Sequence, residues 1–292
     1  MATTTARIPE SPRRSPPGAW LIDVLSALGA RGYDIIRDGL DETGDMTVLT
    51  GKTVVSALRP PYPYGNEFVL QFLFALRVCW LPMLISTVAF GYEAPGLQAA
   101  NFLTLFGALD RLGGFFVLAS IREFAPFVTA VVMAGVAGTA ITADLGARKI
   151  RDELDALVVM GVDPIKNLVV PRFLSLMLVT GLFDIYALLF GIFGGVLATL
   201  VNHAPLGPFL ATLSNNAETT DLWASVAKTT LFGAIIAIVC CYKGMTASGG
   251  AAGVGRAVNQ AVVIAFLGIF SFNYAFTQVL LATHPAITTI AK

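Results

Sequence analysis

The residues most able to do chemistry in this sequence are a few charged side chains that interrupt long apolar stretches. They are Arg77, Arg122, Glu123 and Asp184. A charge inside a bilayer is costly, so such residues pair with one another or serve a transport path. Neighbours on a helix point about 100° apart, so Arg122 and Glu123 need not pair together, and Arg77 and Asp184 are candidate partners on other helices. A buried structural pair and a functional role are both open for these residues.

A second group of charges lies in the segment 144–161, between two apolar stretches. A helical projection of this segment places its apolar residues on one side: Ala147, Ile150, Leu154, Leu157 and Val158. We expect one short amphipathic helix, capped at its start by Thr142 or Asp144. Gly161 and Pro164 are expected to end it.

The charges of this segment are spaced one helical turn apart. The expected ion pairs are Arg148 with Asp152, Lys149 with Glu153, and Arg151 with Asp155. Exposed pairs of this kind contribute about 0.3 kcal/mol each. A solvated surface helix is one interpretation. The other is a docking helix that offers a soluble partner an apolar stripe with a charged rim.

Two other segments look like phosphate-binding loops but lack the required context. Thr50–Thr53 ends like a P-loop, yet Met46 stands where that motif needs glycine. The glycine-rich run 249–255 has no strand–helix–strand context, so we expect a tight turn there. His203 and His284 lie at the ends of apolar stretches, and the sequence has no Gly-x-Ser-x-Gly motif. We therefore expect no nucleotide site, no catalytic residue and no metal site in this chain.

The composition identifies the elements that must position these residues. The chain has 292 residues, of which 55% are hydrophobic and 13% charged, and its mean hydropathy is +0.73. A water-soluble domain carries about 25% charged residues, so an ordinary soluble enzyme and a disordered chain are both excluded. The 19 basic and 19 acidic residues balance, which gives no reason to expect nucleic-acid binding. We predict an all-α polytopic membrane protein.

About 20 apolar residues cross a bilayer as a helix, and the sequence offers five such spans. They are expected at about 67–91, 112–141, 166–200, 223–247 and 258–283. The apolar segment 94–109 contains Pro95, Gly96 and Gly107, so we expect a short external or re-entrant helix there. Lys243, near one end of the fourth span, is expected to reach the cytoplasmic interface.

The amino-terminal region is more polar than the five spans. Residues 1–17 predict a disordered cytoplasmic tail. Residues 18–42 alternate apolar and charged side chains at helical spacing, and 48–58 continue the pattern as far as Pro60. This pattern is too polar to span a membrane, so we expect the region 18–66 to lie as amphipathic helices in the membrane interface.

Orientation follows from the Lys and Arg residues of the connecting segments. They are frequent in residues 1–66 and 142–166, whereas the connections 92–110 and 201–222 contain none. Five spans with the amino terminus in the cytoplasm satisfy this alternation. The carboxyl-terminal tail, residues 284–292, is then expected outside, on the periplasmic side.

Aromatic side chains concentrate in the first and fifth spans. They either face lipid and pack the helices, or they line an apolar cavity for a lipid-like ligand. The residues that we expect to line such a cavity are Phe72, Leu76, Trp80, Phe272 and Phe276.

Several runs of residues resemble those of a known family. The central ones are Glu123-x-x-Pro126-x-x-Thr129-Ala130-x-x-x-Ala134-Gly135-x-x-Gly138, Ala143-Asp144-Leu145-Gly146 and Glu153-x-Asp155-Ala156-Leu157-x-x-Met160-Gly161-x-x-Pro164. They are similar to the MlaE/YrbE permeases, membrane subunits of MCE-associated ABC lipid transporters, over residues 45–283. Three further runs resemble the A-type YrbE subunit of actinobacterial (mycobacterial) Mce systems. They are Val48-Leu49-Thr50-Gly51-Lys52, Cys241-Tyr242-Lys243-Gly244 and Ser248-Gly249-Gly250.

This resemblance implies a fold and a set of partners. An interfacial elbow helix would precede the five spans, and 144–161 would be a coupling helix that fits a groove on a separate ATPase. The residues implied in that coupling are Asp144, Arg148, Arg151, Glu153, Asp155, Leu157 and Met160. The implied partners are a B-type YrbE permease in a heterodimer, an MceG-like ABC ATPase dimer that uses ATP and Mg, and a hexamer of MCE-domain proteins.

The resemblance also implies import of lipids across the plasma membrane: phospholipids, fatty or mycolic acids, or sterols. The chain itself would then bind no cofactor. Two other functions remain open from the residues. One is a proton-coupled secondary carrier that uses Arg122, Glu123 and Asp184. The other is a membrane-embedded lipid-modifying enzyme that uses His203 or His284.

Overall fold

The computed structural model describes residues 19–60, 62 and 64–284. The expected tail 1–17 and all but the first residue of the tail 284–292 lie outside this part of the chain. All secondary-structure elements among the described residues are helices, which confirms the all-α prediction. The chain divides into two units, of which the first ends at Val48 and the second begins at Leu49.

The long amino-terminal helix α1 (Ala19–Leu58) crosses the boundary between these units. The structure therefore has one continuous helix where the sequence indicates two amphipathic segments. The helix ends just before Pro60, because a proline disfavours helical geometry in the residue that precedes it. The predicted position of this helix in a membrane interface stays a prediction.

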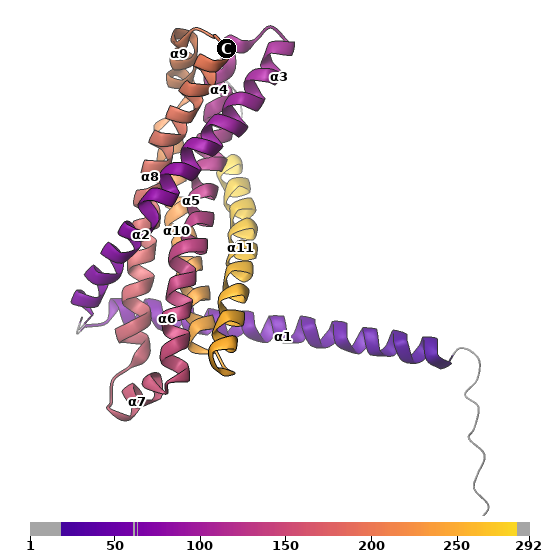
Figure 1. The fold of residues 1–292 in the computed structure, drawn as a ribbon, viewed down its shortest axis with the longest axis vertical. Coiled ribbons are helices and arrows are strands. Elements are labelled where there is room, and N and C mark those ends of the chain that lie inside the picture. Colours follow the sequence, from indigo (N-terminus) through magenta and orange to yellow (C-terminus); the bar gives the residue numbers. More distant parts are fainter. Residues whose placement is uncertain (1–18, 61, 63, 285–292) are drawn as a thin grey trace, which may run out of the picture. The chain divides into compact units, whose positions relative to one another are not determined.

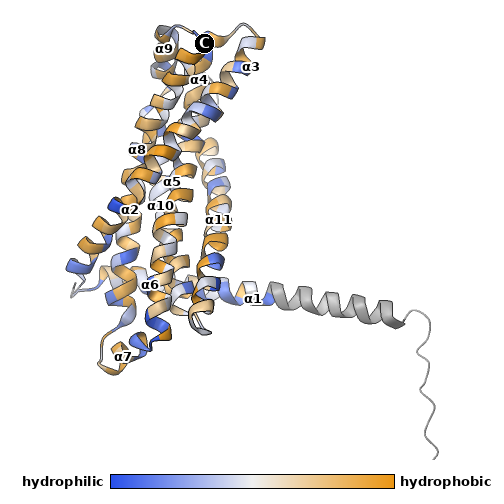
Figure 2. Cartoon of the chain, viewed as in Figure 1, coloured by the Kyte–Doolittle hydropathy of each residue, from blue (hydrophilic) through white to orange (hydrophobic). Residues whose placement is uncertain are grey.

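Five helical runs are long and apolar enough to cross a membrane, as predicted (Figure 2). They are Gly65–Leu105, Leu109–Ile150, Ile165–Val201, Thr219–Met245 and Gly250–Thr283. The shortest has 27 residues, or about 40 Å of helix, which exceeds the hydrocarbon thickness of about 30 Å.

The first run does not stop at residue 91 as predicted. Helix α2 (Gly65–Gly91) continues through the π-helix η1 (Tyr92–Gln98) into α3 (Ala99–Leu105). The prediction of a separate short helix at 94–109 is therefore wrong. Pro95, which has no amide hydrogen to donate, lies inside the π-helical stretch. Gly96 serves packing rather than chain reversal, because a Cβ there would collide with Ala198 of the third run.

The second run changes helix type several times. It comprises η2 (Leu109–Arg111), α4 (Leu112–Phe116), the π-helix η3 (Val117–Phe124), α5 (Ala125–Met133), the π-helix η4 (Ala134–Gly138) and α6 (Thr139–Ile150). A short helix, α7 (Glu153–Val159), follows it. The third run is η5 (Ile165–Val169) with α8 (Val170–Val201), and α9 (Leu206–Asn216) connects it to the fourth.

Helix α10 (Thr219–Met245) forms the fourth run and α11 (Gly250–Thr283) the fifth. Helix α8 packs against α2 and α10, and α10 packs against α11 and α6. Within this bundle, α3, α4 and α9 gather at one end and α7 lies at the opposite end (Figure 1). Within the 18-residue apolar stretch of each run, at least half of the residues are buried in the second, third and fourth runs, but only 17% in the first and 11% in the fifth.

Helix α11 contacts its neighbours along a narrow stripe. Its buried residues recur every fourth position: Gly253, Ala257, Ala261, Ala265 and Ile269. Small residues let helix backbones approach closely in a membrane protein. The connection before α11 covers residues 246–249, and φ is 89° at its last residue, Gly249, and 67° at the first residue of the helix, Gly250. The rest of the glycine-rich run 249–255 is helical, so the predicted turn is shorter than expected.

Candidate functional site

Arg122 and Glu123 lie in the π-helix η3, one of the segments where the second run departs from α-helical geometry. π-helical turns are rare and occur frequently at functional sites. Lys228 of α10 donates a hydrogen bond from Nζ to the backbone carbonyl oxygen of Arg122, at 2.6 Å. A lysine side chain thus anchors the π-helix to the fourth span.

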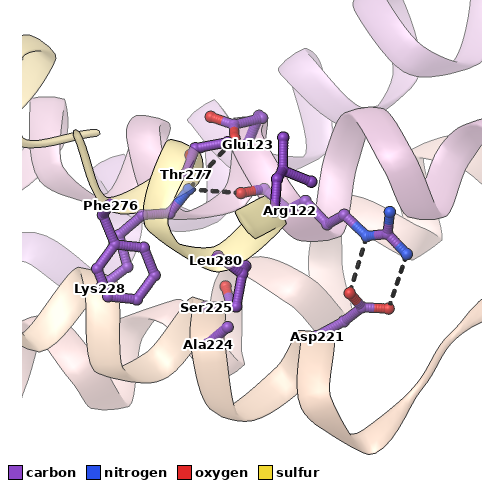
Figure 3. Close-up of a pocket in the computed structure, with 10 residues that line it drawn as sticks. Arg122, Glu123, Asp221, Ala224, Ser225, Lys228, Phe276, Thr277 and Leu280 are labelled. Atoms are coloured by element: carbon purple, nitrogen blue, oxygen red, sulfur yellow. Dashed lines mark hydrogen bonds and ion pairs between the residues drawn. The ribbon is translucent and has the colours of Figure 1, made fainter. Parts of the chain in front are cut away.

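Arg122 pairs with an acid that the sequence analysis did not select. Its Nε lies 2.8 Å from Oδ1 of Asp221, and its Nη2 lies 3.2 Å from Oδ2 (Figure 3). This two-pronged geometry is the strong form of an Arg–carboxylate pair. Asp221 is buried in the first turn of α10 and also accepts a hydrogen bond from the backbone amide of Glu218, at 3.2 Å. Asp221, and not the expected candidate Asp184, is therefore the acidic partner of Arg122.

Glu123 links the second span to the fifth. Its Oε2 accepts a hydrogen bond from Asn273 Nδ2, and its Oε1 accepts one from Thr277 Oγ1, both at 2.9 Å. Lys228 Nζ lies 3.5 Å from the same Oε1. Arg122 and Glu123 thus point to different partners, as the angle between neighbouring helix positions predicts. Arg122 has Asp221 as its counterion and Glu123 has Lys228. These separate pairs do not favour a proton relay from Arg122 to Glu123.

Asp184 and Arg77 differ from Arg122 and Glu123 in their surroundings. Asp184 of α8 is fully buried, and its Oδ2 accepts a hydrogen bond from Ser225 Oγ at 2.8 Å. Arg122, Glu123, Asp221 and Lys228 form what we call the membrane cluster. Arg77 lies on the exposed side of α2 and does not join this cluster. Arg77 is a charge in an apolar helix, and it forms no ion pair with any residue that the structure describes.

The charges of the cluster line a small pocket together with apolar side chains of α10 and α11 (Figure 3). Its lining residues include Arg122, Glu123, Asp221, Lys228 and Phe276. The cavity volume is about 30 Å³, and a single buried water needs about 10–15 Å³. The pocket has room for about two waters and not for a lipid chain in this conformation.

The apolar cavity expected between two permeases stays a prediction, because the structure describes one chain. Among its predicted residues, Phe276 lines the small pocket, and Phe272 packs edge-on against Phe232 with ring centres 6.0 Å apart. Phe72, Leu76 and Trp80 lie on α2, which packs mainly against α8, whereas α11 packs mainly against α10 and α6.

The segment 144–161 is not one helix, contrary to the prediction. Helix α6 ends at Ile150 and α7 begins at Glu153, because Asp152 takes a left-handed conformation with φ 57°. Aspartate tolerates this conformation better than most residues. We call residues 144–161 the hairpin. The expected cap at Thr142 or Asp144 is also wrong, since the helix already runs through from Thr139.

The end of the hairpin follows the prediction. Gly161 has a φ of 77° and its amide donates to the carbonyl oxygen of Val158, while the amide of Val162 donates to that of Leu157. This is the common glycine-terminated end of a helix. The carbonyl groups of the last turn of α7 are thereby satisfied just before Pro164.

The bend in the hairpin changes its ion pairs, and the three predicted pairs are wrong. The observed pairs are Arg148 with Asp144 at 3.2 Å, Lys149 with Asp155 at 3.0 Å, and Arg151 with Glu153 at 2.7 Å. The hydrogen bond that Arg151 donates to the Glu153 carboxylate raises the pKa of the Arg151 guanidinium. Two of these pairs join the end of α6 to α7, so they hold the bend closed.

The tip of the hairpin exposes apolar side chains. Val158, Val159 and Met160 are 60%, 88% and 67% exposed, whereas Leu154 is buried and Leu157 half-buried. Single exposed apolar residues are ordinary, but three consecutive ones beside a rim of charges are typical of an interaction surface.

The sequence reasoning missed several residues of the membrane cluster. Asp221 falls in the predicted connection 201–222, and Lys228 lies near the start of the predicted fourth span, 223–247. A usable signal was present, because Asp221, Ser225 and Lys228 are spaced i, i+4 and i+7 and therefore share one helix face. Lys243 also differs from expectation: it is largely buried and donates to Gln260 Oε1 at 3.1 Å, so it points into the bundle.

The other candidate motifs do not form reaction centres with the cluster. Thr50–Thr53 lies within the helix α1, whereas a P-loop wraps phosphate with non-helical backbone. His203 lies in a left-handed turn after α8, and His284 follows the last residue of α11 with its Nδ1 3.0 Å from Thr283 Oγ1.

Comparison with known proteins gives a consistent result. The model of the family described as "Permease MlaE" matches residues 68–279. A "Probable ABC transporter permease protein" of Synechocystis is 38% identical over 180 residues, which cover 61% of this chain and 68% of the relative. The chloroplast protein TRIGALACTOSYLDIACYLGLYCEROL 1 of Arabidopsis thaliana is 30% identical over 79% of this chain and 66% of its own.

A third relative covers nearly its whole length. The "Intermembrane phospholipid transport system permease protein MlaE" of Haemophilus influenzae is 27% identical over 264 residues, or 89% of this chain and 98% of the relative. The family match includes both the membrane cluster and the hairpin. The Synechocystis and Haemophilus relatives are named permeases, which agrees with the expectation for this chain. The chain belongs to the MlaE permease family and is a multi-pass inner-membrane permease of the ABC transporter class.

Proposed function

We propose that this chain is the permease subunit of an ATP-driven, Mce-type lipid transporter and corresponds to an A-type YrbE subunit. Its family supports the permease role, and the phospholipid transport named for the Haemophilus influenzae relative supports a lipid as cargo. The runs Val48–Lys52, Cys241–Gly244 and Ser248–Gly250 support the A-type assignment through their resemblance to that subunit.

The observation that carries this proposal is the hairpin, which extends beyond the membrane-spanning runs and exposes apolar residues beside charges. A soluble ATPase docks on the hairpin, with Val159 and Met160 at the centre of the contact and Arg151, Glu153 and Asp155 at its rim. The partner is an MceG-like ATPase dimer that binds ATP and Mg, and this chain binds neither.

The proposed orientation follows from the charge distribution, and the remaining partners follow from the resemblance to the YrbE permeases. Lys and Arg concentrate before the first span and in the hairpin, which places both in the cytoplasm and the carboxyl terminus in the periplasm. The helix α1 then serves as an interfacial elbow. A B-type YrbE permease completes the membrane unit, and a hexamer of MCE-domain proteins receives or delivers lipid on the outer side.

The lipid passes between the two permeases rather than through one of them. Helices α2 and α11 are the least buried runs, so a large part of each helix remains open to a partner. Phe72, Leu76 and Trp80 of α2 and Phe272 and Phe276 of α11 line the acyl-chain path at this interface. The direction is import, and the cargo is a phospholipid, a fatty or mycolic acid, or a sterol.

Charge reversal on the hairpin tests this proposal. In the native complex, the double variant Glu153→Lys/Asp155→Lys is expected to lose the co-purifying ATPase, because the rim charges then repel their partners. The matched control is Asp110→Lys, an exposed acid in η2 at the opposite end of the bundle. The purified chain alone is expected to bind and hydrolyse no ATP. An intact complex with the reversed hairpin contradicts the proposed docking surface.

A further inference from the structure

A single buried arginine joins three membrane runs at the hairpin end of the bundle. The guanidinium of Arg172 on α8 is fully buried. Its Nη2 donates to Oδ2 of Asp144 on α6 at 2.6 Å and lies 3.6 Å from Oε1 of Glu67 on α2. Its Nη1 donates to the backbone carbonyl oxygen of Leu168 at 2.8 Å. Buried charges of this kind are retained only where their partners are well placed.

The acids around Arg172 are themselves held in position. Asp144 Oδ1 accepts from Arg148 at 3.2 Å, and Glu67 Oε1 accepts from Gln71 Nε2 at 2.9 Å. One hydrogen-bond donor of the arginine, its Nε, is buried without a partner. An unsatisfied buried donor is costly. A shift of the Arg172 side chain that gave Nε a partner would therefore be favourable.

The structure also leaves space for such a shift. A cavity of about 270 Å³ opens between α2, α6 and α8 beside the arginine. Its lining residues are Gln71, Phe74, Ala140, Ile141, Asp144, Arg148 and Arg172. A packed interior has few voids larger than a water molecule. The cavity is open to the outside, so side chains of α2 and α6 do not fill the space between the two helices at this level.

The hairpin is connected stiffly to this group. Asp144 lies six residues before the end of α6 at Ile150, which is about 9 Å along the helix. The pairs Lys149–Asp155 and Arg151–Glu153 join α7 to the end of α6. A displacement of the tip is thus carried along α6 to Asp144.

We propose that Arg172, held by Asp144, is the positioning residue through which movement of the hairpin reaches α2 and α8. This inference rests on the proposed function, because the hairpin moves only if a partner pushes it. Helix α2 forms one wall of the proposed lipid path. Through the Asp144–Arg172 bond, a displacement of the hairpin in the cytoplasm therefore shifts α2 and changes the shape of that path. In this proposal Asp144 acts on the membrane-spanning helices through Arg172 and does not contact the ATPase.

The first part of the test uses the full chain alone. Nitroxide labels are placed at position 159 in the hairpin and at position 178 on α8, where Val159 and Leu178 are exposed. The native cysteines Cys79, Cys240 and Cys241 are buried and do not compete for the label. The variant Asp144→Asn is expected to fold, because Glu67 remains as a counterion for Arg172.

Asp144→Asn is expected to broaden the distance distribution between the labels, and Asp144→Glu is expected to restore most of its sharpness. The matched control is Asp163→Asn at the other foot of the hairpin. Asp163 is exposed and its Oδ1 accepts from the amide of Ile165, a bond that asparagine can keep. This control is expected to leave the distribution unchanged. An unchanged distribution in Asp144→Asn overturns the proposal.

The second part uses the complex in vesicles of phosphatidylethanolamine and phosphatidylglycerol, with a fluorescent phosphatidylethanolamine as probe. In Asp144→Asn the ATPase is expected to stay bound and to hydrolyse ATP. The lipid moved per ATP is expected to fall about tenfold, within the range of typical coupling between distant sites. A ratio equal to wild type overturns the proposal, and so does loss of the ATPase, which makes Asp144 a docking residue. If the wild-type complex moves no lipid, the proposed function fails while the spin labels still decide on the Asp144–Arg172 bond.

Discussion

The membrane cluster and the hairpin use the same kinds of charged side chain in opposite surroundings. In the cluster, the side chains of Arg122 and Asp221 are 14% and 0% exposed, whereas in the hairpin those of Arg151 and Glu153 are 59% and 44% exposed. Removing one partner of a buried pair costs about 3–5 kcal/mol, and an exposed pair is worth about 0–1 kcal/mol. The cluster therefore fixes how the helices pack, and the hairpin keeps its charges available to a partner.

The largest expected effect on folding comes from breaking the buried pair. Asp221→Ala removes the buried carboxylate that pairs with the Arg122 guanidinium, which is expected to cost about 3–5 kcal/mol of unfolding free energy. Equilibrium unfolding in detergent micelles measures this loss. The double variant Arg122→Ala/Asp221→Ala is expected to recover part of it, because no charge is then left alone. A single variant as stable as wild type contradicts the structural role of the pair.

A smaller effect is expected at the bend of the hairpin. Asp152→Val places a β-branched side chain in the left-handed conformation and is expected to cost about 1–2 kcal/mol. Asp152→Gly is expected to relieve the same position. Amide hydrogen exchange along α7 reports this difference, with faster exchange in the valine variant. Equal exchange in the two variants means that the left-handed turn does not control the hairpin.

The smallest effect on stability is expected at the exposed pair. Arg151→Ala is expected to change the unfolding free energy by less than about 1 kcal/mol, yet to weaken retention of the ATPase in a pull-down. The two measurements together sharpen the contrast between the regions. A loss of stability as large as that of Asp221→Ala removes the contrast.

The number of spans was predictable because long apolar runs with few charges have one stable arrangement in a bilayer. Their ends were not, because Pro95 was read as a break although a π-helical stretch accommodates it. The bend at Asp152 was missed for a similar reason, since a helical projection assumes that the helix is continuous.

The site was predictable only in part. Arg122, Glu123 and Asp184 stood out as charges in apolar stretches, and the structure places all three beside α10. Their partners come from elsewhere: Asp221 lies 99 residues from Arg122 along the chain. Local patterns carry no information on which helices pack together at such separations. The role of Arg172 was hidden in the same way, because its partners Glu67 and Asp144 lie on two other helices.

The stripe of small residues on α11 has a geometric consequence for whatever lies outside the bundle. Five positions spaced four apart, from Gly253 to Ile269, advance by roughly 160° around a helix of 3.6 residues per turn. The seam with α10 and α6 therefore winds nearly halfway around α11. The open side winds with it, so a neighbouring helix or an acyl chain that follows α11 from one membrane face to the other must spiral about it rather than run straight.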